Sequence, residues 1–160
     1  MSRDIKRATP FLQWFWPVFQ QAVKDELNLD IFLIDVDRGW KVQRAYYAQG
    51  RDTLSVVNHL RKAAGLPIIT TAQNKRKITW TMKSKHITNL ENESPYDDYS
   101  RAIDIGLKTK DGRYVGEAQA DLNKDGIADY KQIGLIGERI GGKRIRWGGR
   151  FGDMPHFEEV

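Results

Sequence analysis

The spacing of apolar residues predicts helices in much of the first half of the chain. Residues 10–27 begin with a proline and carry apolar side chains at roughly helical intervals. Residues 39–49 resume this pattern and stop at Gly50, and residues 53–64 form a further helical pattern. The short run of branched residues at 31–36 lies between these helices and predicts a strand.

The second half of the chain has the pattern of strands and turns. Lys110-Asp111-Gly112 predicts a hairpin turn, and residues 130–140 predict a helix that stops at two glycines. The predicted strands of this half are 78–82, 102–107, 113–115, 144–147 and 156–158. The order of elements indicates an α+β fold, with N-terminal helices packed on a small, mostly antiparallel sheet.

The length of 160 residues suits one domain, and no repeat, linker or change of composition divides the chain. We therefore predict a single domain over residues 1–160. The apolar stretch 11–18 is interrupted by Gln13 and Pro17, is too short to span a bilayer and precedes no cleavage site. From this we expect no signal peptide and no stable membrane insertion.

Composition limits the chemistry of any metal site. The chain has no cysteine, so a bound metal would rest on His, Asp and Glu. The net charge of +5 fits a polyanionic partner, whether nucleic acid, anionic lipid or cell-wall polymer, and does not choose among them.

The three histidines are the first candidates for chemistry. His59 lies within the predicted helix 53–64 and is interpreted as structural. A catalytic zinc site needs three nitrogen or oxygen ligands and an open position for water, which His86, His156 and one carboxylate would supply. Asp104 is the favoured carboxylate because it interrupts an apolar strand, where a charged group needs a partner. The alternative is a strand residue on a solvated face.

Four motifs, in this order, resemble a family of zinc peptidases that act on bacterial cell wall. Arg38 and Gln43 precede the first, Tyr-Tyr-Ala-Gln-Gly-Arg, and Ser84-Lys85-His86 is the second. Ala102-Ile103-Asp104 is the third, and Asp153-Met154-Pro155-His156 is the fourth, following Trp-Gly-Gly. The family includes phage L-alanyl-D-glutamate endolysins, D-alanyl-D-alanine carboxypeptidases and vancomycin-resistance dipeptidases.

The resemblance implies a role for each matching residue. His86, Asp104 and His156 would bind zinc, and Asp153 would be the general base that takes a proton from water. Arg38 would bind the carbonyl oxygen as it gains charge, the alternative being a surface residue before a helix. The supporting residues would be Ser84, through hydrogen bonding, and Gln43.

The segment 87–100 departs from the family pattern. It makes the interval between His86 and Asp104 unusually long, and Ser100 stands where the family has glycine. The segment is polar and contains proline, which predicts a loop that shapes access to the metal. It also adds four competing carboxylates, which are Glu91, Glu93, Asp97 and Asp98.

A second metal site is predicted in the segment 121–129, which resembles the first half of a calcium loop. Gln132 stands where such a loop has its bidentate glutamate. The alternative is an Asx-rich turn that caps the helix 130–140. The predicted calcium ligands are Asp121, Asn123, Asp125, the Ile127 carbonyl and Asp129.

The resemblance implies a zinc-dependent peptidoglycan endopeptidase of the phage endolysin type, which cuts stem peptides at the L-alanyl–D-glutamate bond. It would be a monomer without a separate wall-binding domain, held in the host cytoplasm until release to the periplasm and cell wall. The first alternative is a D-alanyl-D-alanine carboxypeptidase or dipeptidase. The second is a basic, non-catalytic nucleic-acid-binding protein, but no nucleic-acid motif supports that partner.

Overall fold

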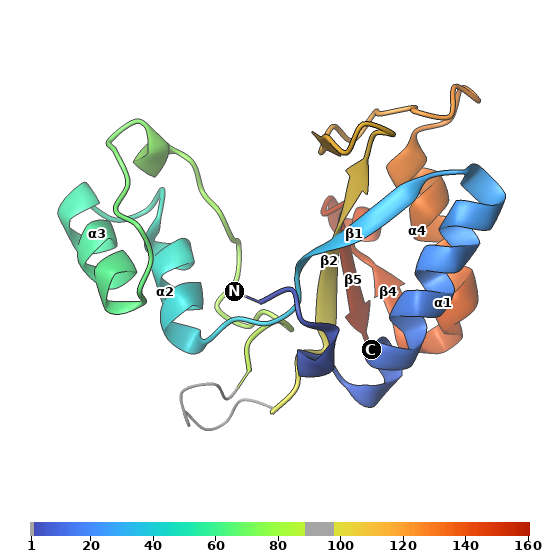
Figure 1. Ribbon diagram of the computed structural model, residues 1–160. Helices are drawn as coiled ribbons and strands as arrows, with labels where there is room; N and C mark the ends of the chain where they lie inside the picture. Colours follow the sequence, from blue (N-terminus) through green and yellow to red (C-terminus); the bar gives the residue numbers. More distant parts are fainter. Residues whose placement is uncertain (1, 89–97) are drawn as a thin grey trace.

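The computed structural model describes residues 2–88 and 98–160 and confirms an α+β fold (Figure 1). Short 3-10 helices occupy Ile5–Arg7, Gln73–Lys75, Gly142–Arg144 and Gly148–Phe151. The longer helices are α1 (Pro10–Leu27), α2 (Trp40–Ala48), α3 (Leu54–Ala63) and α4 (Asp129–Gly141). The strands are β1 (Asp30–Asp35), β2 (Ala102–Lys108), β3 (Tyr114–Val115), β4 (Ile145–Trp147) and β5 (His156–Glu159).

The sheet is antiparallel and has the order β1-β2-β5-β4, with β3 paired to β2 through the predicted hairpin. Asp104 on β2 is in register with Asp35 on β1 and with His156 on β5. Because side chains alternate along a strand, Ile103 and Ile105 enter the core while Asp104 points to the opposite face. The pairing therefore sets three polar residues side by side across three strands.

One face of the sheet packs against α1 and α4 (Figure 1). An aromatic cluster fills this layer, with ring centroids 5.0 Å apart for Phe15 and Phe19 and 4.9 Å apart for Phe19 and Phe157. α4 approaches the sheet closely at Gly134, where a Cβ atom would lie 2.3 Å from the Trp147 ring. The face of α4 that meets the sheet thus depends on the absence of a side chain.

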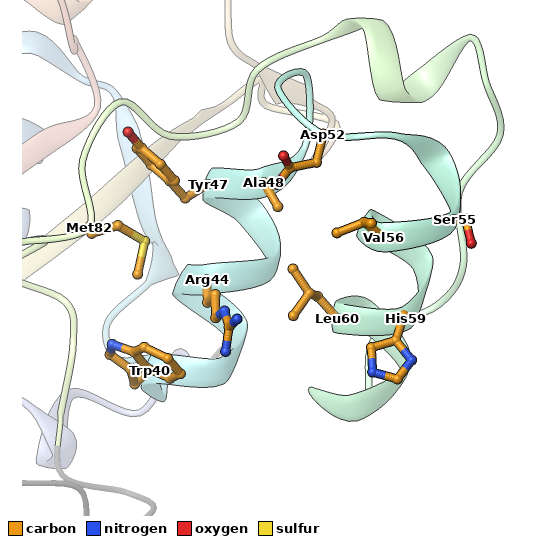
Figure 2. Close-up of a pocket in the computed structure, with 10 residues that line it drawn as sticks. All are labelled: Trp40, Arg44, Tyr47, Ala48, Asp52, Ser55, Val56, His59, Leu60 and Met82. Carbon is orange, nitrogen blue, oxygen red and sulfur yellow. The ribbon is translucent and has the colours of Figure 1, made fainter.

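The other two helices, α2 and α3, pack on each other and lie on the far side of the chain from α1 and α4 (Figure 1). Thr53 caps the start of α3 by accepting a hydrogen bond from the Val56 N–H. A hollow between the two helices is lined by Trp40, Arg44 and the exposed His59 (Figure 2). His59 thus belongs to the surface of the helix pair, and its side chain does not enter the core.

The strand predicted at 78–82 is wrong, because this segment crosses beside α2 without joining the sheet. Its carbonyl groups are bound by side chains instead: Arg51 donates to the Thr79 oxygen at 3.0 Å, and Gln43 donates to the Thr81 oxygen at 2.6 Å. Trp80 is 77% exposed, so the apolar run does not enter the core. We call residues 76–85 the strap, since they lead from the helix pair back to the sheet.

No helix among the described residues is both long enough and apolar enough to cross a membrane.

Candidate active site

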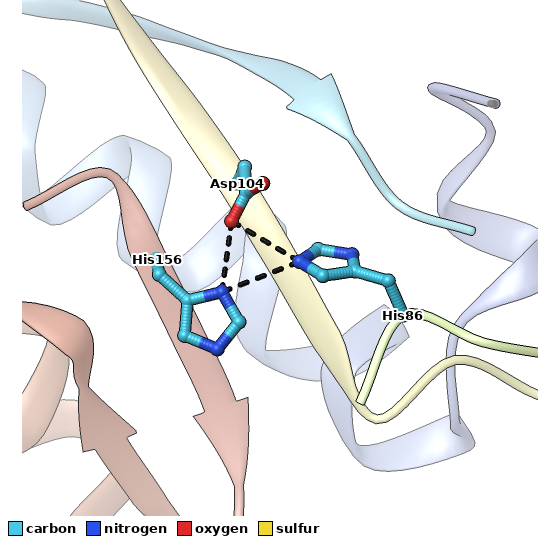
Figure 3. A group of neighbouring side chains, drawn as sticks. All are labelled: His86, Asp104 and His156. Atoms are coloured by element: carbon cyan, nitrogen blue, oxygen red, sulfur yellow. Dashed lines mark hydrogen bonds and ion pairs between the residues drawn. The ribbon is translucent and has the colours of Figure 1, made fainter. Parts of the chain in front are cut away.

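Three predicted ligands converge on the face of the sheet opposite α1 and α4 (Figure 3). The Asp104 Oδ1 atom lies 2.9 Å from His156 Nδ1 and 3.1 Å from His86 Nε2, and the two nitrogen atoms are 3.2 Å apart. Ligand atoms bound tetrahedrally at typical zinc distances are separated by about 3.3 Å. The observed spacing is close to that value, so the three residues fit a tetrahedral ion with little movement.

Each imidazole ring is oriented by a partner on its other nitrogen. His86 Nδ1 donates to the main-chain carbonyl of Val36 at 2.8 Å, because a carbonyl can only accept, and this leaves Nε2 for a metal. His156 Nε2 donates to the Glu158 carboxylate at 3.1 Å, so Nδ1 is the atom that would ligate. The two histidines therefore present different ring nitrogens to the group.

The charges of these residues reinforce one another. Burial works to raise the pKa of Asp104, but the adjacent imidazoles of His86 and His156 outweigh it and hold that pKa far below its usual range. Burial works to lower the pKa of His156, but hydrogen bonds to Asp104 and Glu158 outweigh it and raise that pKa to about 9. The hydrogen bond from His156, with help from Arg146, lowers the pKa of Glu158 to about 2. Asp104 is thus anionic at any physiological pH, in the form in which it could bind a metal ion.

Main-chain hydrogen bonds fix the segment that carries His86. The Ser84 hydroxyl accepts a hydrogen bond from the His86 N–H at 3.3 Å. The Arg38 N–H donates to the His86 carbonyl at 3.0 Å, and the Thr88 N–H donates to the Arg38 carbonyl at 3.2 Å. The backbones of Arg38 and of the segment that carries His86 therefore run together.

A cleft of about 1190 Å³ opens over the group and is also lined by Arg38 and Asp153. This volume exceeds the roughly 300–1,000 Å³ of ordinary small-molecule pockets, which suits an extended substrate. Crowding by protein, followed by the negative charge of Asp104, raises the pKa of Asp153, which nevertheless stays exposed to solvent. An accessible carboxylate with a raised pKa is suited to accept a proton.

Arg38 lines the cleft and is held in place by an ion pair. Its Nη2 atom lies 3.1 Å from the Asp35 carboxylate, and its buried Nε atom has no partner among the described residues. Burial raises the pKa of Asp35, although Arg38 opposes this shift. The ion pair fixes a guanidinium that lines the cleft, where its positive charge can stabilise an oxygen atom that gains negative charge.

Other predicted residues lie elsewhere. Gln43 is fully buried behind the strap and bonds it through Thr81 and Thr79 without lining the cleft. Among the competing carboxylates, Asp98 is exposed and is not part of the metal group, while Glu91, Glu93 and Asp97 fall outside the described residues. Within the described chain, His86, Asp104 and His156 form the one cluster of His, Asp or Glu side chains spaced for a shared ion.

The segment predicted to bind calcium is folded into tight turns by its own side chains. Asp121 accepts hydrogen bonds from the N–H groups of Asp125 and Gly126 at 3.1 and 2.9 Å, and Asp125 accepts one from Ile127 at 2.9 Å. Asn123 also accepts from the Asp125 N–H. The N-cap of α4 is Ala128, so these side chains build the turn without capping the helix. Calcium binding therefore stays a prediction.

Two functional side chains were not singled out from the sequence, namely Asp35 and Glu158. Asp35 follows apolar residues in β1, which is the signal that had indicated Asp104. Glu158 lies two positions after His156 in one strand, and residues two apart share a face of the sheet. Both residues could have been found by applying strand alternation to the predicted strands.

The antiparallel sheet gathers two histidines and an aspartate beneath an open cleft, with an arginine and a second aspartate beside them, and this arrangement is suited to holding a metal ion next to an acid–base carboxylate. No family model matches the chain. The chain is 32% identical over 143 residues to the peptidoglycan L-alanyl-D-glutamate endopeptidase CwlK of Bacillus subtilis, a match that covers 88% of this chain. This similarity supports membership of the zinc peptidase family whose motifs the sequence carries. The match spans 66% of CwlK, just under two thirds of its length.

Proposed function

We propose that the chain is a zinc-dependent peptidoglycan endopeptidase of the phage endolysin type that hydrolyses the L-alanyl–D-glutamate bond of stem peptides. The observation that carries the proposal is the convergence of His86, Asp104 and His156 in a cleft shared with Asp153 and Arg38. The activity named for the similar Bacillus protein supports the choice of bond.

The residues of the cleft divide the chemistry among them. A zinc ion held by His86, Asp104 and His156 would supply the positive charge that polarises the scissile carbonyl and acidifies water. Asp153 accepts the proton of the attacking water and then delivers it to the leaving amine. Arg38 donates to the carbonyl oxygen as negative charge develops there, which stabilises the transition state more than the bound substrate.

The proposal also covers place and regulation. The enzyme acts as a monomer on peptidoglycan stem peptides, after release from a host cytoplasm to the periplasm and cell wall. Calcium ordering of the segment 121–129 would regulate it. A calorimetric titration with calcium tests this regulation. Absence of binding heat, together with unchanged activity in a calcium-selective chelator, would refute it.

The decisive experiment combines elemental analysis of the purified protein with mass spectrometry of muropeptides after digestion. We expect one zinc per chain and cleavage between L-alanine and D-glutamate. Asp153→Asn should abolish cleavage while zinc is retained, and His156→Ala should lose both. Asp25→Asn, an exposed change on α1, is the matched control and should behave as wild type. Wall-degrading activity in both site variants would refute the mechanism.

The same spectra distinguish the alternative enzyme class. Release of free D-alanine, with the L-alanyl–D-glutamate bond intact, would identify a D-alanyl-D-alanine carboxypeptidase or dipeptidase instead.

A further inference from the structure

The cleft over the metal group is charged unequally on its two walls. The sheet side carries the carboxylates Asp35, Asp104, Asp153 and Glu158. The opposite wall, formed by α3 and the strap, carries only cations among its charged lining residues in the described chain, which are Arg61, Arg76, Lys83 and Lys85. A substrate that lies in the cleft therefore meets a basic wall facing an acidic one.

The cations of the basic wall differ in how they are partnered. Arg61 is engaged within the protein, because it donates to the Pro67 carbonyl at 2.7 Å and to the Gln49 side chain at 3.1 Å. The side chains of Arg76, Lys83 and Lys85 make no hydrogen bond or ion pair with any residue that the structure describes. Their charges are thus available to the cleft.

The arginines at the sheet edge differ from the cations of the basic wall, because each of them has an ion-pair partner. Arg144, Arg146 and Arg150 each pair with a glutamate of the protein, and those three ion pairs lie outside the basic wall. Cations that line one cleft and have no ion-pair partner gain electrostatic energy when an anion binds among them. The basic wall therefore has the electrostatics of an anion site placed beside the reacting group.

We propose that Arg76, Lys83 and Lys85 bind the free carboxylate of the D-glutamate residue next to the scissile bond and so determine substrate specificity. This inference rests on the proposed function. Glutamate has two carboxyl groups and a linear peptide uses one of them, so an unmodified stem peptide carries a free carboxylate within one residue of the reacting carbonyl. Lys83 and Lys85 lie within three residues of the metal ligand His86, and both line the same cleft as His86.

A single carboxylate fits this cleft better than a longer polyanion. A phosphate backbone that followed the cleft would also meet the four carboxylates on the sheet side and be repelled by them. The wall also exposes Trp80, which is 77% accessible and lies on the strap between Arg76 and Lys83. It offers an apolar surface for the uncharged part of a peptide.

The test uses two soluble stem peptides that differ only in whether the free D-glutamate carboxylate is present or converted to its carboxamide. We expect wild type to cleave the amide with kcat/KM reduced by about tenfold or more, because a site built for a charged group rejects its neutral analogue. In the triple variant Arg76→Gln, Lys83→Gln, Lys85→Gln the two peptides should be cleaved with kcat/KM values within about threefold of each other. For the peptide with the free carboxylate, the triple variant should raise KM and leave kcat close to the wild-type value.

The controls separate the ways in which the test can fail. Lys131→Gln on α4, an exposed change outside the cleft, should keep the wild-type ratio between the two peptides. If the triple variant does not fold, the three single variants replace it. Each of them should reduce the ratio of kcat/KM between the carboxylate peptide and the amide peptide. A wild-type ratio in the variants, or an equal loss on both peptides, overturns the inference.

A third peptide, amidated only at its C-terminus, tests the other source of a carboxylate. If wild type cleaves this peptide more slowly than the unmodified one, and the variants cleave the two equally, the wall binds the terminal carboxylate. In that case the assignment to D-glutamate is wrong. If wild type cleaves none of the peptides, the proposed function fails, and that result is distinct from any change in ratio.

Discussion

At the scale of single residues, the metal group depends on how its two imidazoles are held. A main-chain carbonyl fixes His86, and no side-chain substitution removes that partner. A carboxylate fixes His156, so this orientation depends on Glu158, which is itself paired with Arg146. The orientation of His156 can therefore be altered by mutating Glu158, without changing any of the three residues proposed to bind the metal.

Glu158→Gln should weaken zinc binding by about 10- to 100-fold, because a neutral amide orients the His156 ring less firmly and does not increase its basicity. Competition with a chromophoric zinc chelator measures the affinity. Glu138→Gln, which removes a carboxylate paired with Arg150 away from the cleft, is the control. Unchanged affinity in Glu158→Gln would show that the hydrogen bond does not support the site.

The Glu159 carboxylate makes a pH-dependent contribution to stability. Burial works to raise its pKa, but hydrogen bonds from Thr9 at 2.6 Å and from Arg144 outweigh it and lower that pKa. A lowered pKa means that the charged form stabilises the fold above the unfolded-state pKa, and that this contribution disappears as the pH falls through the folded-state pKa.

Glu159→Gln should therefore reduce the free energy of unfolding by about 1–3 kcal/mol at neutral pH, with a smaller difference below about pH 4. Urea unfolding of both proteins at the two pH values measures the effect, with the exposed Glu117→Gln as control. If the free energies of unfolding of wild type and Glu159→Gln differ equally at both pH values, the stabilisation does not come from the charge of Glu159.

At the scale of elements, most helices and strands could be predicted from alternation along strands and from helical spacing. The four long helices were predicted within one residue at each end, because caps and glycines mark their boundaries. Residues 78–82 of the strap were predicted to form a strand, but the carbonyl groups of this segment are bound by Gln43 and Arg51, which are distant in sequence. Such tertiary partners leave no periodic signal in the segment itself.

The same limit applies to the site. The motifs named the residues that the structure brings together, but spacing alone did not show that Glu158 holds His156 or that Asp35 holds Arg38. Both partnerships depend on strand register, and register is set by pairing between segments far apart in the chain.

Gly134→Ala tests the close approach of α4 to the sheet. The added methyl group would lie 2.3 Å from the Trp147 ring, so helix and strand must separate, and we expect a loss of about 1–3 kcal/mol despite the better helix propensity of alanine. Chemical denaturation measures the loss. Leu135→Ala, next to it but half-exposed, should cost less. A stabilised Gly134→Ala protein would contradict the packing described for α4.

At the scale of the whole molecule, the cleft is built from two separate packing units. One is the sheet with α1 and α4, which holds the aromatic core, and the other is the α2–α3 pair with the strap. Asp104, Asp153 and His156 come from the first unit, and the cations of the basic wall come from α3 and the strap. The function we propose therefore requires both units.

Removal of zinc should abolish peptidase activity and lower the unfolding temperature, because an ion bound only by the folded state stabilises it by mass action. At free zinc of 100 times the dissociation constant this amounts to about 2.7 kcal/mol. Calorimetry before and after chelation measures the shift, and added zinc should reverse it. No shift on chelation would show that the folded protein does not retain the ion.

The central position of β5 in the sheet determines when a refolding chain can acquire its metal group. His156 is 52 residues from Asp104 and 70 from His86, so the ligands meet only after β5 has inserted between β2 and β4. Contacts of such long range form late and slowly compared with helices. Ion capture during refolding would thus report completion of the sheet, and a spectroscopic metal probe would time that one event within the folding reaction.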